Sequence, residues 1–176
     1  EDCVSVVLID QSTAVVEQEI VKRTGKVFTI PVGDYLIGRV INAQGYPLDA
    51  CGELNCSEWL PITREISGIS QRSPVNRPLE SGILTIDSLI PIGRGQRELI
   101  IGNRGTGKTS LAIDTILHQK NKNVICIYVS IGHKQSSTAK IIYQLEKHGA
   151  LDYTILVNAD AKETALSQFL APYAGC

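Results

Sequence analysis

The chain has 176 residues, with 17 basic and 18 acidic side chains and a net charge of −1. Hydrophobic residues make up 43% and charged residues 20%, which is typical of a folded globular protein and not of a disordered one. The near-neutral charge argues against a general nucleic-acid binder, and no apolar run approaches the roughly 20 residues that a membrane-spanning helix needs. Because methionine is absent, we expect an interior or processed piece of a longer protein.

The cysteines are predicted to be reduced and structural. Their spacing is wide and irregular, which gives no disulfide framework, and no pair has the C-x-x-C spacing of a zinc site. Cys51 and Cys56 are close together, but no histidine is grouped with them, so we expect no metal there. Reduced thiols suit a protein that faces the cytosol. The five cysteines are Cys3, Cys51, Cys56, Cys126 and Cys176.

Three β-rich runs in the first 41 residues predict part of a small sheet or barrel. They cover residues 4–9, 26–30 and 35–41, with turn signals between them. Residues 48–78 are irregular and rich in proline, so they are predicted to be connecting structure.

After Pro78 the pattern changes to strands that alternate with helices. This alternation predicts an α/β fold with a parallel sheet and helices on both faces. Residues 109–118 show helical periodicity, and residues 124–129 are a continuous apolar run, typical of a parallel strand covered on both faces. The other predicted elements are a strand at 98–101, a helix from Ser136 or Ser137 to Gly149, a strand at 153–157 and a helix at 163–170.

Residues 102–109 read Gly-Asn-Arg-Gly-Thr-Gly-Lys-Thr and match the phosphate-binding pattern G-x-x-x-x-G-K-[ST]. Glycines allow successive backbone N–H groups to point at phosphate oxygens, and the following helix directs its positive end at the same oxygens. Lys108 is predicted to reach the β- and γ-phosphates, and the Thr109 hydroxyl to bind Mg²⁺. The alternative is a glycine-rich turn that binds nothing. The predicted nucleotide-binding residues are Gly102, Asn103, Arg104, Gly105, Thr106, Gly107, Lys108, Thr109 and Ser110.

A carboxylate at the end of a neighbouring strand is expected to complete the magnesium shell. Asp10 and Asp160 are the candidates. Asp10 lies in the separate β-rich region, and Asp160 lies beyond the end of its predicted strand, so neither suits the role. We expect the true partner after Cys176.

Residues 91–102, together with residues 109–116, closely resemble the α-subunit family of F-type, proton-translocating ATP synthases. The resemblance extends to residues 21–25, 31–40, 79–89 and 170–176. It implies a RecA-like P-loop nucleotide-binding domain in residues 38–176. It also implies that residues 1–37 are the C-terminal part of an N-terminal β-barrel domain.

The resemblance further implies a regulatory, non-catalytic subunit of the soluble head of the synthase, which binds ATP or ADP with Mg²⁺. The implied partners are β subunits alternating in a ring of six, a central rotor shaft and a peripheral stalk, without nucleic acid and with membrane contact only through the complex. The segment formed by residues 119–124 is short, as it is in the bacterial and plastid members of the family, whereas mitochondrial members carry an insertion there. The implied location is therefore the cytoplasmic face of a bacterial plasma membrane, with the stromal face of a thylakoid membrane as the alternative.

Three positions depart from the family pattern. Asn103 and Gly105 stand where the family has aspartate and glutamine, and neither change removes a backbone donor. His133 stands where α subunits have glutamine and where catalytic β subunits have the glutamate that positions the attacking water. The family's magnesium-shell aspartate and trans-acting arginine lie after the matched segment, so no catalytic residue is expected here. The alternatives are a self-sufficient hexameric ATPase of the termination-helicase or export type, and a structural remnant that binds no nucleotide.

Overall fold

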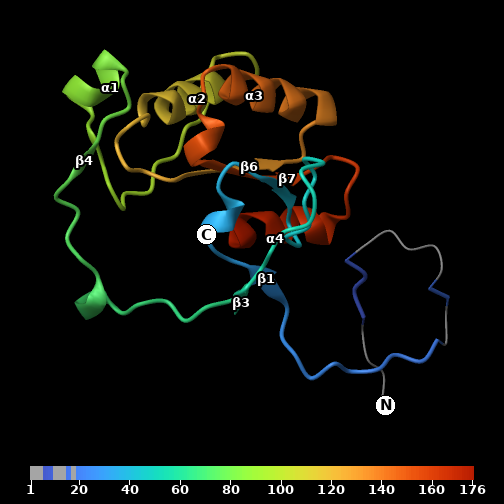
Figure 1. The fold of residues 1–176 in the computed structure, drawn as a ribbon. Helices are drawn as coiled ribbons and strands as arrows, with labels where there is room; N and C mark the ends of the chain where they lie inside the picture. The colour runs from blue at the N-terminus through green and yellow to red at the C-terminus, as the bar shows by residue number, and fades with distance from the viewer. Residues whose placement is uncertain (1–5, 10–14, 17–18) are drawn as a thin grey trace.

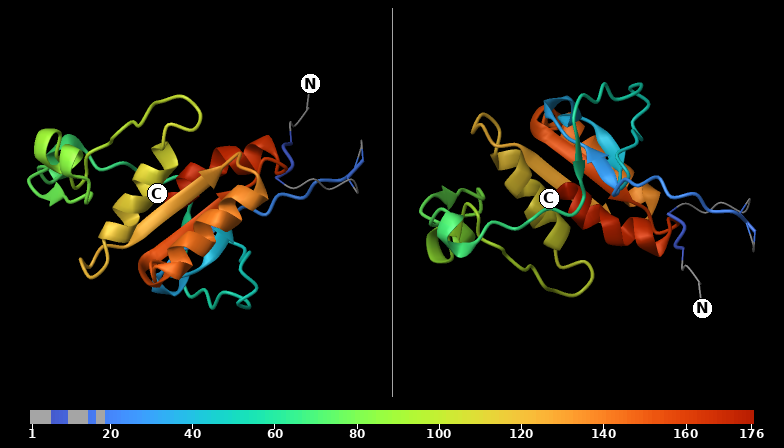
Figure 2. Two further views of the ribbon diagram at one scale, coloured as in Figure 1. Left: turned by 90° about the horizontal axis from the view of Figure 1, so that it is seen from above. Right: turned by 90° about the horizontal axis from the view of Figure 1, so that it is seen from below.

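The computed structural model describes residues 6–9, 15–16 and 19–176. Its centre is a three-stranded parallel sheet with the strand order β2-β7-β6. Helices α2 and α3 cover one face of this sheet and α4 covers the other (Figures 1 and 2). The predicted α/β class with helices on both faces is confirmed. The bounds are Val40–Asn42 for β2, Cys126–Ile131 for β6, Thr154–Ala159 for β7, Lys108–His118 for α2, Gln135–Lys147 for α3 and Ala165–Gly175 for α4.

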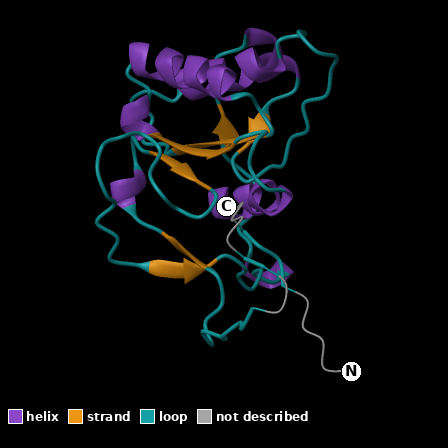
Figure 3. Cartoon of the chain, turned by 90° about the vertical axis from the view of Figure 1, so that its right-hand side faces the viewer, coloured by secondary structure: helices purple, strands orange, loops and turns teal. Residues whose placement is uncertain are grey.

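Two hydrophobic clusters form the core, one on each face of the sheet. Successive side chains of a strand point to opposite faces, so neighbouring residues belong to different clusters. Val40 and Leu156 are register partners and pack under α2 and α3. Ile41 and Val157 are the next pair and pack under α4 with Ala171. The alternation along β2 and β7 therefore joins both helical layers to one sheet, as Figure 3 shows from the side.

The N-terminus of α3 differs from the prediction. The helix begins at Gln135 after Lys134, and no side chain caps it, so the prediction of Ser136 or Ser137 as the cap is wrong. The backbone N–H of Ser137 donates to the carbonyl of Lys134 at 2.8 Å, which closes the first turn before either serine can act as a cap. Both serines lie instead inside the first turn.

The predicted end of α3 at Gly149 is confirmed. This glycine has a φ of +66°, a left-handed conformation that favours glycine. Its N–H donates to the carbonyl of Glu146 at 2.9 Å, and the N–H of Ala150 donates to the carbonyl of Leu145 at 2.8 Å. This pair of bonds is the Schellman pattern that ends many helices.

The predicted N-terminal strands are mostly not formed. Residues 6–9 contain no strand, and residues 4 and 5 lie outside the described residues. Strand β1 (Thr29–Pro31) overlaps the second predicted run and pairs with β3 (Trp59–Pro61), which lies in the region predicted as connecting structure. Of residues 35–41, the first two lie in the 3₁₀ helix η1 (Asp34–Leu36), residues 37–39 form a turn, and the last two begin β2, which pairs with β7 far along the chain. The assignment of residues 1–37 to a barrel domain stays a prediction.

The predicted strand at residues 98–101 is also not formed. Leu99 is 80% exposed and Ile101 is 82% exposed. An extended segment gains ladder hydrogen bonds only from a neighbouring strand, and among the described residues no strand pairs with this segment. The remaining elements around it are short: η2 (Ile69–Gln71), β4 (Pro78–Leu79), α1 (Leu84–Leu89), β5 (Ile92–Gly93) and η3 (Leu151–Tyr153).

A bidentate ion pair fixes the loop after β2 to the start of that strand. Arg39 Nε lies 2.6 Å from Asp49 Oδ2, and Arg39 Nη2 lies 2.9 Å from Asp49 Oδ1. The carboxylate also accepts the backbone N–H groups of Val40 at 3.0 Å and Cys51 at 3.1 Å. Both charged side chains are mostly buried, with 16% and 11% exposed. The hydrogen bonds from the Arg39 guanidinium lower the pKa of Asp49 from 3.8 to about 2.

Replacing Asp49 by asparagine is expected to lower the free energy of unfolding at pH 7 by about 2 kcal/mol. A carboxylate with a lowered pKa stabilises the fold above the pKa of the unfolded chain. This contribution should fade as the pH falls from about 4 to about 2, because the carboxylate becomes protonated. Denaturant titrations of wild type and Asp49→Asn between pH 7 and pH 3 measure the difference. Asp114→Asn, an exposed aspartate on α2, is the control. An equal loss in both variants, or a pH-independent difference, would contradict this role.

Candidate nucleotide-binding site

The predicted phosphate-binding residues lie in one exposed turn and in the first turn of α2. Gly107 is the N-cap of this helix and has a φ of +93°, which L side chains rarely adopt. The N–H of Leu111 donates to the carbonyl of Gly107 at 2.9 Å and begins the helical ladder. Residues 102–106 form the turn before the helix, and Lys108, Thr109 and Ser110 form its first turn.

The side chain of Lys108 folds back over the turn. Its ammonium group donates to the carbonyl oxygen of Gly102 at 2.5 Å and to that of Asn103 at 2.6 Å. The hydroxyl of Thr106 also donates to the carbonyl of Asn103, at 2.8 Å. Hydrogen bonds from a charged donor are stronger than neutral ones, so they hold the turn around the ammonium group. The structure thus brings Lys108 and the glycine-rich turn together as the sequence predicts.

The N-terminus of α2 presents backbone donors to an anion. The first N–H groups of a helix have no acceptor within the helix, and Gly107 has no side chain to supply one. The first turn also contains no acidic residue, so the positive end of the helix dipole is not neutralised locally. These features fit a phosphate group. The exposed Thr109 hydroxyl in the same turn is an oxygen ligand of the kind that Mg²⁺ prefers.

His133 lies between β6 and α3, at the carboxyl edge of the parallel sheet. Its carbonyl accepts the N–H of Ala161 at 3.1 Å, and the N–H of Gly132 donates to the carbonyl of Ala159 at 2.9 Å. The turns after β6 and β7 are therefore bonded to each other. Among the described residues, no hydrogen bond or ion pair joins His133 to residues 102–109.

The two aspartates weighed as magnesium ligands are placed as follows. Asp160 comes directly after β7, and its Oδ1 accepts the side-chain amide of Asn158 at 2.9 Å. Asp10 lies outside the described residues. Within the described part of the chain, no group of three or more histidine, cysteine, aspartate or glutamate side chains could hold a metal ion.

A buried polar chain beneath the carboxyl edge was missed by the sequence reasoning. Ser130 Oγ and Thr138 Oγ1 lie 3.1 Å apart, and Thr138 Oγ1 donates to Asn158 Oδ1 at 3.3 Å. All three residues are at most 5% exposed. Buried polar groups need hydrogen-bond partners, and these three side chains supply partners for one another. Their hydrogen bonds link β6, α3 and β7 close to the turn that contains His133. Ser130 and Asn158 each follow a run of apolar residues within a strand, and that change from apolar to polar was the available signal.

Of the five cysteines, Cys3 lies outside the described residues, and Cys51, Cys56, Cys126 and Cys176 are free thiols. Burial raises the pKa of Cys126.

None of the helices in the described residues has the length and apolar character that crossing a membrane requires.

Comparison with known proteins places these features in a family. The model of the ATP synthase alpha/beta family, nucleotide-binding domain, matches residues 82–176, which include the turn, α2 and His133. The chain is also 53% identical, over all of its 176 residues, to ATP synthase subunit alpha of Acetivibrio thermocellus. It spans about a third of the length of this curated relative, 35%. The resemblance inferred from the sequence is confirmed, and the chain belongs to the ATP synthase alpha/beta family.

Proposed function

We propose that this chain is a nucleotide-binding, non-catalytic part of the α subunit of a proton-translocating ATP synthase. The observation that carries the proposal is the Lys108 ammonium held over the glycine-rich turn at the N-terminus of α2. Similarity to a bacterial subunit alpha along the whole chain supports the α-subunit assignment over the helicase and export-ATPase alternatives. ATP and ADP, with Mg²⁺, are the ligands.

Each predicted site residue has a role in this proposal. The backbone N–H groups of residues 102–107 and of the first turn of α2 bind phosphate oxygens, and Lys108 binds the β- and γ-phosphates. Thr109 supplies its hydroxyl to Mg²⁺, which neutralises phosphate charge when bound. His133 is proposed as a non-catalytic residue at the position that a glutamate occupies in catalytic subunits.

The wider assembly is part of the same proposal. The partners are β subunits in an alternating ring, the rotor shaft and the peripheral stalk, with the nucleotide domain spanning residues 38–176. The pairing of β2 with β7 supports a boundary before residue 40. The bacterial source of the relative supports the cytoplasmic face of a bacterial plasma membrane, with the plastid membrane as the alternative.

Calorimetric titration with Mg-ATP, and with ATP in the presence of a chelator, tests the proposal. Wild type should bind both and should bind Mg-ATP more tightly. Thr109→Val should lose the difference between the two titrations, because it removes the hydroxyl but keeps the shape. Thr85→Val, at an exposed position on α1, is the matched control and should keep the difference. Absence of binding in folded wild type would favour the structural remnant instead.

A further inference from the structure

Two side chains of the proposed phosphate-binding turn donate hydrogen bonds to one backbone oxygen, the carbonyl oxygen of Asn103. The ammonium group of Lys108 lies 2.6 Å from this oxygen, and the hydroxyl of Thr106 lies 2.8 Å from it. A carbonyl oxygen has two lone pairs, so it can accept both bonds at once. Among the described residues, the carbonyl oxygen of Gly102 accepts a hydrogen bond from the ammonium group alone. The Asn103 carbonyl is therefore the acceptor that the two side chains share.

The hydroxyl of Thr106 lies against the backbone of Gly102. A Cβ atom at Gly102 would come within 2.7 Å of Thr106 Oγ1, so a side chain at this position would displace the hydroxyl from the Asn103 carbonyl. The same Cβ atom would lie 3.8 Å from the Lys108 side chain. The hydrogen bond from Thr106 joins the two ends of the segment 103–106 and does not involve Lys108. The hydroxyl therefore closes the turn independently of the ammonium group.

We propose that Thr106 is a positioning residue for nucleotide binding, an inference that rests on the function proposed above. When the ammonium group of Lys108 moves to phosphate oxygens, the Asn103 carbonyl keeps one donor, the Thr106 hydroxyl. That bond holds the turn closed, so its backbone N–H groups stay directed at the phosphate. Without the hydroxyl, the carbonyl loses its last donor as the nucleotide covers the turn, and a covered polar group without a partner costs affinity.

Calorimetric titration with Mg-ATP should show that Thr106→Val binds about fivefold more weakly than wild type, the loss expected for one neutral hydrogen bond. Valine keeps the shape of threonine but has no hydroxyl, whereas Thr106→Ser keeps the hydroxyl and should restore most of the affinity. Thr85→Val, at an exposed position on α1, is the matched control and should bind as wild type does. Without nucleotide, Thr106→Val should melt at the same temperature as wild type, because Lys108 still bonds the Asn103 carbonyl.

Combining Thr106→Val with Lys108→Ala separates positioning from a purely structural role. In Lys108→Ala, the Asn103 carbonyl has the same single donor with and without nucleotide, so loss of the hydroxyl affects both states equally. Thr106→Val should therefore weaken Mg-ATP binding about fivefold in wild type and leave the affinity of Lys108→Ala unchanged. A hydroxyl that contacted the nucleotide itself, or shaped the turn only for the bound state, would cost the same factor in both backgrounds.

Three outcomes would overturn the role of Thr106 and leave nucleotide binding itself intact. They are equal affinity of wild type and Thr106→Val, a serine variant that binds as weakly as the valine variant, and the same loss of affinity in the Lys108→Ala background. If Thr106→Val fails to fold, Thr106→Ala compared with Thr106→Ser makes the same test. Folded wild type that binds no Mg-ATP would instead overturn the proposed function, and this inference with it.

Discussion

Replacing Lys108 by alanine is expected to weaken Mg-ATP binding about 10- to 100-fold. The ammonium group is positioned over the turn, and its charge-assisted bonds to phosphate are worth about 1.5–3 kcal/mol each. That free energy corresponds to the stated loss of affinity. Calorimetric titration of wild type and Lys108→Ala measures it. Lys120→Ala, an exposed lysine after the end of α2, is the control and should bind as wild type does.

Comparable affinity in a folded Lys108→Ala protein would contradict the assignment of the phosphate site. Lys108→Arg adds a second comparison. It keeps the charge but replaces a compact ammonium by a planar guanidinium. We expect an intermediate affinity, because the turn is closed around the smaller group by two short bonds.

The second expected result is the absence of ATP turnover by this chain. Transfer of a phosphoryl group to water requires a positioned nucleophile, a bridging Mg²⁺ and positive charge at the transition state. Lys108 and Thr109 can supply part of the last two requirements. His133 is proposed to stand where a catalytic subunit has its glutamate, and a protonated imidazole at that place would be attracted to the γ-phosphate and not to the water. Loss of a trans-acting arginine alone costs on the order of 10³–10⁵ in rate.

Phosphate release by the purified chain measures turnover directly. The rate should not rise above background in wild type, and His133→Glu should not restore it, because a glutamate supplies only one of the missing groups. Steady release by wild type that Lys108→Ala abolishes would overturn the non-catalytic assignment. In that case His133 would become the first residue to replace.

Local signals predicted the elements that carry the proposed phosphate-binding turn. The periodicity of residues 109–118 corresponds to α2, and the apolar run at 124–129 corresponds to β6. Both signals are contained in a short stretch of neighbouring residues, so they can be recognised from the sequence alone. α3 ends before Gly149, as predicted, because only a few neighbouring backbone groups take part in the C-terminal cap. The phosphate-binding pattern itself needs eight consecutive residues and no distant contact.

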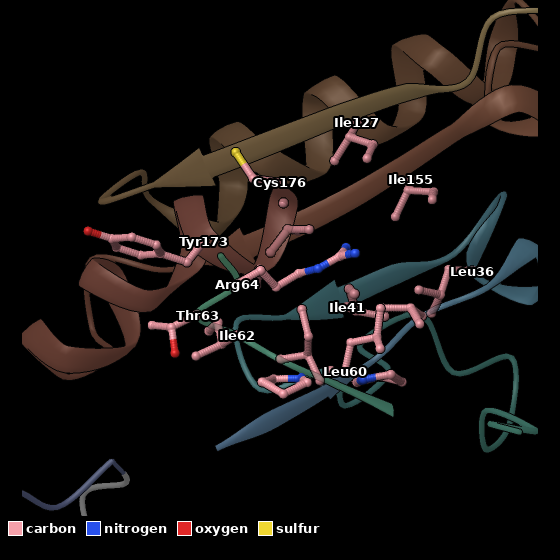
Figure 4. A pocket seen from close by; sticks show the side chains of 18 of the residues that line it. Leu36, Ile41, Leu60, Ile62, Thr63, Arg64, Ile127, Ile155, Tyr173 and Cys176 are labelled. Carbon is pink, nitrogen blue, oxygen red and sulfur yellow. The ribbon is translucent and has the colours of Figure 1, made fainter. Parts of the chain in front are cut away.

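Features that depend on distant partners were not predictable in this way. β2 is a strand because it pairs with residues more than a hundred positions later, and nothing near Val40 indicates that partner. Residues 98–101 have the composition of a strand but no neighbour in the described structure to pair with. The cavity of about 680 Å³ beside α4 (Figure 4) is lined by residues from Ile30 to Cys176, so no short stretch of the sequence indicates it. Short-range patterns specify elements, whereas pairing and cavities depend on the whole fold.

The bonds from Lys108 to two carbonyls have a consequence for how affinities at this site are to be interpreted. In the structure, the ammonium group already has oxygen partners that belong to the chain itself. Binding a phosphate at the proposed site would therefore exchange one set of acceptors for another instead of adding a new contact. The two carbonyls belong to the same chain as the ammonium group, so they compete with phosphate for it. Diluting the protein does not weaken that competition. A measured affinity then reports the difference between two occupied states, so a substitution that loosens the turn can alter nucleotide binding without touching the nucleotide.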